Sequence, residues 1–224
     1  MLIAKFIAVI ILSYLIGSVP FGVIIGRKFT GIDIRKFGSG KMGATNVLRT
    51  AGKKAAIITG TLDVLKGAIP VILTGLIMKN VYLMVSNVNL GTVAPQVVAA
   101  MAAVFGHTFS IFLKFRGGRG VATFFGGLVA LCPIAGVFGI EVLIICIGFT
   151  RFVSFGSIVG AVATYTILIP LTLLNGFPFV LLVYSLIGAI FIIVMHRDNI
   201  ARLLRGTERK LGDRVKLESS SPTN

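Results

Sequence analysis

Apolar runs long enough to cross a membrane repeat along most of the chain. A run of about 20 apolar residues spans the hydrocarbon core of a bilayer as a helix. Of the 224 residues, 56% are hydrophobic and only 13% are charged, and the mean hydropathy of +0.99 lies outside the range of ordinary soluble domains. These runs predict an all-α protein, a polytopic transmembrane helical bundle.

The positions of the runs predict about seven helices. Pro133 divides the long run Val121–Thr150 into two shorter helices, because proline interrupts helical hydrogen bonding. The remaining runs are Leu2–Ile25, Ala55–Ile77, Thr92–Phe105, Phe155–Leu174 and Phe177–Met195. The alternative is five spans, if the two shortest helices are re-entrant or merged. We expect a single domain over residues 1–214 and a polar, disordered tail at 215–224.

Basic residues concentrate in particular loops, and this pattern predicts the orientation in the membrane. Of the 22 Lys and Arg residues, eight lie in Gly26–Lys54, three in Gly106–Gly120 and seven after His196. The N-terminus and the loops on the opposite side hold only Lys5 and Lys79. Because cytoplasmic loops carry the excess of positive charge, the N-terminus is expected outside and the C-terminus in the cytoplasm.

The net charge of +15 also restricts the partners. In a soluble protein such a charge would suggest nucleic acid. Here the basic residues lie between apolar runs, so anionic membrane lipids and phosphorylated substrates are expected instead. The seven acidic residues are scattered over loops and spans and there is no zinc motif, so neither a metal nor another cofactor is expected.

A glycine-rich loop precedes the run that begins at Val121. Glycine lets backbone N–H groups turn toward a bound anion, and the start of the following helix adds unpaired N–H groups. Arginine supplies forked donors that suit phosphate oxygens. The candidate phosphate-binding residues of this loop are Gly117, Gly118, Arg119 and Gly120. The loop lacks the spacing of a Walker A motif, and a plain basic turn is the alternative interpretation.

A second polar stretch, Gly38–Arg49, stands beside an apolar run. Ser39 offers a hydroxyl, Asn46 an amide and Arg49 a guanidinium, a set that suits a phosphate or a polar head group. The alternative is a flexible loop whose glycines only turn the chain. We favour binding, because the asparagine and the arginine precede a span instead of lying in an isolated linker.

Two ionisable residues, Asp63 and Lys66, lie within the apolar run Ala55–Ile77. Their three-residue spacing places them on one helix face, where they can form an ion pair. Ionisable groups inside a span usually face the bundle interior or a cavity. Either the pair is purely structural, or Lys66 extends toward the cytoplasmic end and adds positive charge to an anion site.

The only histidines, His107 and His196, are both expected at the cytoplasmic face. Histidine is a frequent proton carrier, although a single interfacial histidine is more often a hydrogen-bonding anchor. We expect that structural role for His107. His196, Asn199 and Arg202 share a helix face at a spacing of three residues, which favours function for this group. A basic amphipathic helix resting on anionic lipid is the alternative.

Taken together, the segments resemble those of the bacterial membrane-integral acyl-phosphate:glycerol-3-phosphate acyltransferases. The resemblance is carried, in order, by GSGKMGATNVLR at Gly38–Arg49, DVLKG at Asp63–Gly67, GHTFSIFLKFRGGRGVAT at Gly106–Thr123, RFVSFGS at Arg151–Ser157 and HRDNIARLLRGTE at His196–Glu208. It extends from the first span to about Arg214. At one position the family usually has lysine where this chain has Arg119, which keeps the charge but presents a planar fork.

The resemblance implies an enzyme in the plasma membrane of a bacterial cell, with its active site on the cytoplasmic face. Such an enzyme transfers a fatty acyl group from acyl phosphate to the 1-hydroxyl of glycerol 3-phosphate. The products are 1-acylglycerol 3-phosphate (lysophosphatidate) and inorganic phosphate, the first step of phospholipid biosynthesis. No cofactor is implied, and a monomer is expected. A transporter of small anions or phosphate esters is the alternative, because basic clusters beside membrane helices would suit it too.

Residue chemistry and the matching motifs together suggest individual roles. The expected catalytic residues are Ser39, Arg49, Ser157, His196 and Asn199, with Ser154 left open as an alternative to Ser157. The expected phosphate-binding residues are Asn46, Lys66, Gly117, Gly118, Arg119 and Gly120. His196 would be a general base or an orienting donor, because the phosphate of glycerol 3-phosphate could itself accept the hydroxyl proton.

Overall fold

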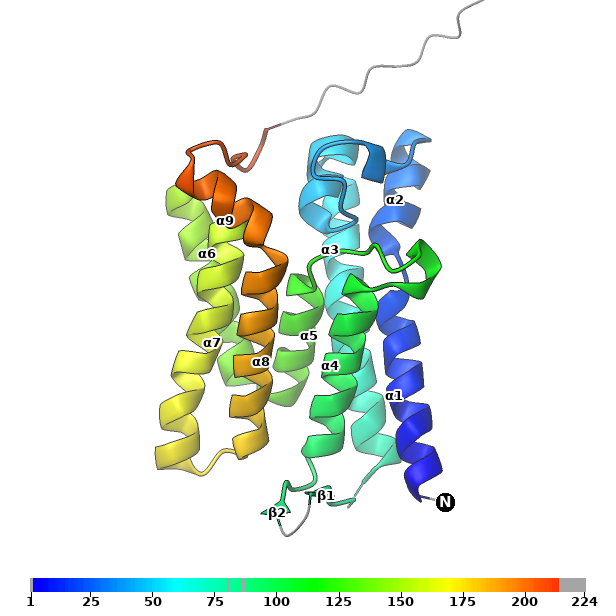
Figure 1. Ribbon diagram of the computed structural model, residues 1–224, viewed down its shortest axis with the longest axis vertical. Helices are drawn as coiled ribbons and strands as arrows, with labels where there is room; N and C mark the ends of the chain where they lie inside the picture. Colours follow the sequence, from blue (N-terminus) through cyan, green and yellow to red (C-terminus); the bar gives the residue numbers. More distant parts are fainter. Residues whose placement is uncertain (1, 80, 86–87, 214–224) are drawn as a thin grey trace, which may run out of the picture.

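The computed structural model describes residues 2–79, 81–85 and 88–213, and it shows helices packed side by side in a bundle (Figure 1). The helices of these residues are α1 (Leu2–Ser18), α2 (Phe21–Thr30), α3 (Ala44–Ile77), α4 (Ala94–Thr108), α5 (Val121–Leu131), α6 (Pro133–Thr150), α7 (Val153–Asn175), α8 (Phe179–Met195) and α9 (Arg197–Leu204). Two 3-10 turns (Ile34–Lys36, Ile111–Leu113) and a short antiparallel hairpin of β1 (Met84–Val85) and β2 (Val88–Asn89) complete the described elements. The tail expected at 215–224 lies outside the described residues.

The helical membrane fold expected from the sequence is confirmed. Five segments, with α1 and α2 counted as one, are long and apolar enough to cross a membrane, and the bent pair of α8 and α9 raises the number to six. α5 is a shorter apolar helix, so the seven expected apolar segments are all helical. Pro133 separates α5 from α6 as predicted, and Cys132 before it leaves the helical conformation (φ −151°, ψ 88°).

α3 begins at Ala44, well before the apolar run that was expected to start the helix at Ala55. Gly52 separates a short first part, residues 44–51, from the long apolar part, because its backbone is not helical (φ 86°, ψ 179°). Glycine adopts such a positive φ at little cost, whereas a side chain there would be strained. Arg49 therefore belongs to a helix and not to a flexible loop, which fixes its direction.

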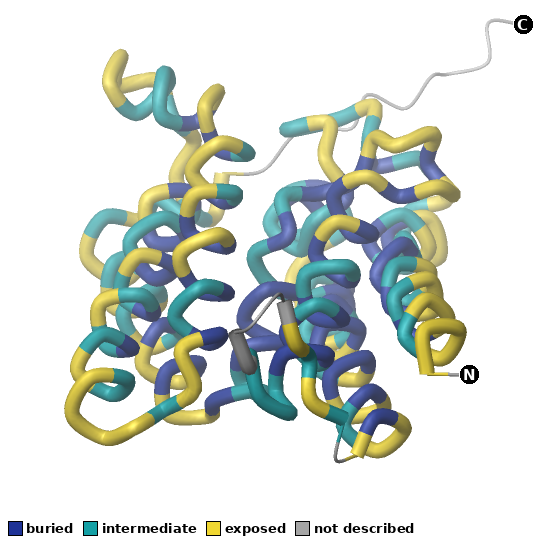
Figure 2. Tube along the Cα trace, turned by 60° about the horizontal axis from the view of Figure 1, so that its bottom comes forward, coloured by how far each residue is buried: buried dark blue, intermediate teal, exposed yellow. Residues whose placement is uncertain are grey.

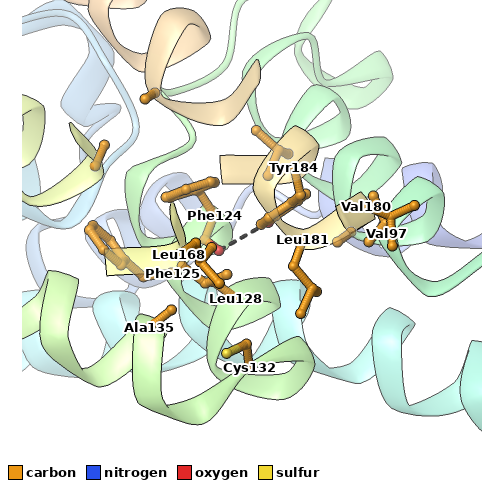
Figure 3. Close-up of a cluster of buried hydrophobic side chains, with 14 of the residues drawn as sticks. Val97, Phe124, Phe125, Leu128, Cys132, Ala135, Leu168, Val180, Leu181 and Tyr184 are labelled. Carbon is orange, nitrogen blue, oxygen red and sulfur yellow. Dashed lines mark hydrogen bonds between the residues drawn. The ribbon is translucent and has the colours of Figure 1, made fainter. Parts of the chain in front are cut away.

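The bundle is centred on α5. Phe124 of α5 stacks on Tyr184 of α8 with ring centroids 5.2 Å apart, and the Tyr184 hydroxyl donates a hydrogen bond to the Phe124 carbonyl oxygen (3.0 Å; Figure 3). Leu128 of α5 and Leu168 of α7 belong to the same buried cluster. This packing holds α5, and with it the glycine-rich loop that precedes it, in the interior of the bundle.

The outer faces of the helices suit contact with lipid. Figure 2 shows that exposed residues run along the outside of the helices. They include large apolar side chains such as Ile3, which is 75% exposed, and Phe149, which is 88% exposed. Lipid tails are as apolar as these side chains, so close packing between helices, and not burial from water, must hold the bundle together.

Glycines bring α3 and α5 into direct backbone contact. A Cβ atom built on Gly126 would overlap the carbonyl oxygen of Val64, and one built on Gly67 would overlap that of Thr123. Small residues at such positions allow membrane helices to approach closely.

We expect Gly126→Val to lower the unfolding temperature in detergent by several degrees. The new side chain must push α3 and α5 apart, and overpacking of this kind costs about 1–3 kcal/mol. Gly148→Val is the matched control, because nothing lies within 4 Å of a Cβ atom at that position. Equal unfolding temperatures for the two variants would contradict the close contact.

Candidate active site

A cavity of about 280 Å³ lies toward the end of the bundle where α3 begins and α9 is attached. Its polar lining includes Ser39, Arg49, Arg119, Ser157, His196, Asn199 and Glu208. Its apolar lining includes Val64, Phe125, Ile140, Leu143 and Val153. The structure thus brings all five expected catalytic residues to one cavity that is polar in one part and apolar in another.

A second cavity, of about 200 Å³, shares part of this lining. The shared residues are Ser39, Lys41, Arg49, Arg119, Asn199 and Glu208. Arg202 and Arg209 line only the second cavity and add to its positive charge. Because guanidinium groups bind phosphate through charge-assisted hydrogen bonds, the polar region is suited to phosphorylated molecules.

Arg49 and Arg119 each bring a guanidinium group to the cavity. The Nε atoms of both side chains are buried and have no hydrogen-bond partner among the described residues. Nη2 of Arg49 donates a long hydrogen bond (3.4 Å) to the carbonyl oxygen of Arg209. Burial lowers the pKa of Arg119, but arginine remains charged at neutral pH. Two half-buried cations with unused Nε–H donors suit the binding of an anion.

The start of α5 also faces the cavity. Gly120 precedes the helix in the left-handed conformation (φ 83°), and Val121 and Ala122 of the first turn line the cavity with it. The first N–H groups of a helix have no intrahelical acceptor and attract anions. Gly120 and Arg119 are therefore placed as the sequence predicts for phosphate binding.

Gly117 and Gly118 have another role than the one expected. The Gly117 N–H donates to the carbonyl oxygen of Thr108 (2.9 Å), and the Gly118 N–H donates to that of His107 (3.0 Å). These donors are already used, which corrects the prediction that they cradle a phosphate. Glycine is needed there for space, since a Cβ atom on Gly118 would overlap Nε2 of His107.

Asn46 lines the main cavity, but its amide donors are used to organise the polar loop before α3. Its Oδ1 accepts the N–H of Ser39 (2.9 Å), and its Nδ2 donates to the carbonyl oxygens of Ile34 (3.0 Å) and Lys41 (2.9 Å). Both N–H donors of the amide are used by these bonds, which corrects its expected role in phosphate binding. Ser39 is held in place by the same bonds and lines both cavities.

Lys66 forms the predicted ion pair but lies outside both cavities. Its Nζ is 2.8 Å from Oδ1 of Asp63 and donates a hydrogen bond to the carbonyl oxygen of Val19 (2.9 Å). Neither cavity includes Lys66 in its lining, so its expected contact with a substrate phosphate is not supported. Of the pair, Asp63 is the residue that reaches the main cavity.

His196 lies at the bend of 61° between α8 and α9. Its Nδ1 is 2.8 Å from the carbonyl oxygen of Ile192. A carbonyl only accepts, so Nδ1 carries the hydrogen, and in the neutral ring Nε2 is then an acceptor. Asn199 donates from Nδ2 to Glu208 (2.6 Å), while its Oδ1 is buried and has no partner within the described residues. Each side chain thus has an acceptor left for a substrate hydroxyl.

Glu208 is the site residue that the sequence did not single out. Its carboxylate accepts hydrogen bonds from Ser154 (2.8 Å), Asn199 (2.6 Å) and Arg202 (2.7 Å). Burial alone would raise the pKa of this carboxyl, but these hydrogen bonds outweigh it and hold the pKa below its usual value. The residue ends the last motif, yet no periodicity or spacing distinguishes it from the other charged residues nearby.

The two serines of α7 are both buried at the cavity but differ in their partners. Ser157 donates to the carbonyl oxygen of Val153 in its own helix (2.8 Å), whereas Ser154 donates to Glu208. Ser157 therefore keeps its hydroxyl oxygen for a ligand, while Ser154 belongs to the support of Glu208. No group of three His, Cys, Asp or Glu side chains that could hold a metal occurs in the described part of the chain.

The chain is similar to a group of acyltransferases over nearly its full length. The family model described as glycerol-3-phosphate acyltransferase matches residues 7–206. Glycerol-3-phosphate acyltransferase 3 of Dehalococcoides mccartyi is 53% identical over 216 residues, which cover 96% of this chain and 100% of that protein. Glycerol-3-phosphate acyltransferase of Thermus thermophilus is 42% identical, with 92% of this chain and 95% of that protein covered.

Two solved structures share the fold. Both are crystal structures of PlsY (YgiH), an integral membrane glycerol 3-phosphate acyltransferase, at 32% sequence identity. Its glycerol 3-phosphate form has a TM-score of 0.79 and covers 92% of this chain and 96% of its own. Its lysophosphatidic acid form has a TM-score of 0.77, with 93% and 96% covered. The transporter alternative is set aside, and this chain belongs to the glycerol-3-phosphate acyltransferase family of integral membrane enzymes.

Proposed function

We propose that the protein transfers a fatty acyl group from acyl phosphate to the 1-hydroxyl of glycerol 3-phosphate, forming lysophosphatidate and inorganic phosphate. The observation that carries this proposal is the cavity that joins two half-buried arginines, whose Nε atoms have no partner among the described residues, to an apolar wall. Both substrates carry a phosphate and one carries a long chain, so this combination fits the pair. The relatives named above include a structure with glycerol 3-phosphate and one with lysophosphatidic acid.

The phosphate groups and the acyl chain bind to different parts of the cavity. Arg49, Arg119 and the start of α5 at Gly120 bind the phosphate groups, because they present charge and N–H donors to the same space. The acyl chain lies along the apolar lining, which includes Phe125 and Leu143. Positioning the two molecules with the hydroxyl next to the acyl carbonyl supplies a large part of the catalysis.

The chemical step needs little further activation, because phosphate is a good leaving group. The hydroxyl oxygen of glycerol 3-phosphate bonds to the acyl carbonyl carbon, the bond from this carbon to the phosphate oxygen breaks, and inorganic phosphate leaves. Asn199 accepts a hydrogen bond from a substrate hydroxyl through Oδ1, and the Ser157 hydroxyl oxygen is a second acceptor. The Ser39 hydroxyl orients the acyl carbonyl and stabilises its developing negative charge. The hydroxyl proton passes to Nε2 of His196 or to a phosphate oxygen of the substrate.

The choice between these two proton acceptors can be tested. If the substrate phosphate is the base, His196→Ala should retain appreciable turnover, with kcat reduced by about tenfold or less, since only an orienting group is lost. A reduction of about 100-fold or more, with the Kd for glycerol 3-phosphate unchanged, would identify His196 as the base. The measurement is kcat of the purified variant alongside calorimetric binding of glycerol 3-phosphate.

The function is tested with purified protein and three acyl donors. Acyl phosphate should give lysophosphatidate from glycerol 3-phosphate, while acyl-CoA and the thioester of acyl carrier protein should give none. The reason is that Arg49 and Arg119 are placed to hold the small phosphate leaving group. Turnover with a thioester and none with acyl phosphate would contradict the proposed donor.

We expect a monomer in the plasma membrane of a bacterium, with the cavity open to the cytoplasm. In a chain without its native cysteines, Cys132 and Cys146, a cysteine at Lys54 should react with an impermeant thiol reagent from the cytoplasmic side only. A cysteine at Lys5 should react only from outside. Reaction of both from the same side would contradict this orientation.

A further inference from the structure

A buried ionic cluster lies beside the glycine-rich loop and takes no part in the chemistry described so far. Asp63 of α3 is 1% exposed, Lys66 2% and His107 of α4 3%. Oδ1 of Asp63 is 2.8 Å from Nζ of Lys66 and 3.6 Å from Nδ1 of His107. Ionisable groups buried in membrane helices are costly and tend to be kept for function, and an apolar pair would pack as well.

His107 contacts the glycine-rich loop through both its backbone and its side chain. Its carbonyl oxygen accepts the N–H of Gly118 (3.0 Å), and the neighbouring carbonyl of Thr108 accepts that of Gly117 (2.9 Å). Its ring Nε2 lies so close to the Gly118 backbone that a Cβ atom there would overlap it. The next residue along the chain is Arg119, so the position of the His107 ring limits where that guanidinium can be.

The cluster is itself anchored to another part of the bundle. Lys66 donates a hydrogen bond to the carbonyl oxygen of Val19 (2.9 Å), between α1 and α2, and its Nζ lies 5.6 Å from the centre of the Phe21 ring. A chain of contacts therefore connects the junction of α1 and α2, through Lys66, Asp63 and His107, to the loop that carries Arg119.

The ring of His107 is not placed to act on a substrate directly. Nδ1 faces Asp63 and Nε2 faces Gly118, so both ring nitrogens are directed at protein groups. The distance of 3.6 Å to Asp63 is too long for a good hydrogen bond, and the interaction is therefore mainly electrostatic. Yet Asp63 and His107 both line the main cavity, next to Arg119 and Gly120.

We propose that Asp63, Lys66 and His107 are positioning residues, which hold the 117–120 loop so that Arg119 points its guanidinium at a substrate phosphate. The proposal rests on the proposed function only in so far as Arg119 binds a phosphoryl group. Holding a cation at a fixed place before the ligand arrives removes the cost of ordering it during binding. His107 therefore acts through Arg119, and its loss should have no effect on binding once Arg119 is gone.

The test is a double-mutant cycle on binding, which requires no turnover. Isothermal titration in detergent measures Kd for glycerol 3-phosphate and, separately, for inorganic phosphate, in the wild type, His107→Gln, Arg119→Ala and the double variant. We expect His107→Gln to raise Kd by about tenfold or more in the wild-type background, since small misplacements are costly. In the Arg119→Ala background the same substitution should change Kd by less than about twofold, because coupled residues are not additive.

Two further variants separate positioning from general damage. Gly118→Ala disturbs the same contact from the loop side and should show the same dependence on Arg119, so it decides the question if His107→Gln does not fold. Thr74→Ala, a buried polar substitution on α3 remote from both cavities, should leave Kd unchanged. The proposal is overturned if His107→Gln weakens binding equally in both backgrounds, if Arg119→Ala leaves Kd unchanged, or if the wild type binds neither probe.

The proposed function and this inference are tested by different measurements, so that either can be contradicted without the other. Lysophosphatidate formation by the wild type tests the function, whereas the binding cycle tests the positioning of Arg119. A protein that binds glycerol 3-phosphate with the expected coupling but makes no product would keep the inference and lose the function. Product formation together with additive effects of the two substitutions on Kd would support the proposed function and contradict the positioning inference.

Discussion

Arg49→Ala should lower kcat/KM for acyl transfer by about a thousandfold, the largest effect expected for a single substitution here. The guanidinium lines both cavities, and its buried Nε has no partner among the described residues, so its donors are available to substrate phosphates. Truncation removes both the charge and the fork of donors from the place where the phosphates bind. The measurement is steady-state kinetics with acyl phosphate and glycerol 3-phosphate, each varied in turn.

Arg49→Lys is the conservative variant at this position, and Lys54→Ala is the control. Lysine restores a point charge but not the planar pair of donors, so an intermediate kcat/KM is expected. Lys54 lies on the same helix beyond Gly52, is exposed and lines neither cavity, so its loss should leave kcat/KM within about twofold of the wild type. If Arg49→Ala costs less than about tenfold, Arg49 does not bind a phosphate in the transition state.

Glu208→Ala should reduce both stability and activity. The side chain of Glu208 is 5% exposed and accepts hydrogen bonds from Ser154, Asn199 and Arg202. Each buried donor left without an acceptor costs about 1–3 kcal/mol, so the unfolding temperature in detergent should fall by several degrees. Asn199 would also lose the bond that fixes its amide, and kcat should fall by about 100-fold. Asp213→Asn, which removes a nearby carboxylate outside both cavities, is the control.

The stability that the Glu208 carboxylate contributes should depend on pH. Its pKa is lowered in the folded protein, so the carboxylate contributes stability that is fully present above the ordinary value of 4.5 and is lost as pH falls through the lowered value. Below pH 4.5 the unfolding temperature of the wild type should therefore fall more steeply than that of Glu208→Gln. Parallel curves for the two proteins would show that this carboxylate adds no stability through its charge.

The fold was largely predictable because a membrane limits the choices for a chain. Apolar runs of the required length, with Pro133 dividing one of them, predicted the seven helical segments. The start of α3 was missed because residues 44–51 mix polar and apolar side chains and are followed by Gly52, a pattern that also describes a loop. Their helix depends on tertiary contacts, such as those of Asn46 with the loop before it, which no local pattern reveals.

The sequence predicted which residues lie at the site better than it predicted what each of them does there. Arg49, Arg119, His196 and Asn199 meet at one cavity, as residue chemistry and the resemblance to the acyltransferase motifs had together suggested. Gly117 and Gly118 were given the wrong role, because a sequence does not reveal which N–H groups are already bonded. Lys66 was assigned to the substrate for a similar reason, since its partner at Val19 is distant in the chain. Glu208 could be found only through its three donors.

The helix α5 is short, and its first turn lies deep along the bundle. A helix of 11 residues is about 16 Å long, roughly half the thickness of the hydrocarbon core. Figure 1 shows that it starts well short of the bundle end formed by α2, α3 and α9, so the phosphates must descend from the aqueous surface to reach Arg119. A donor whose tail stays among the lipid chains can present its carbonyl at this depth. The tail then need not be exposed to water, which would cost about 0.8 kcal/mol for every methylene group.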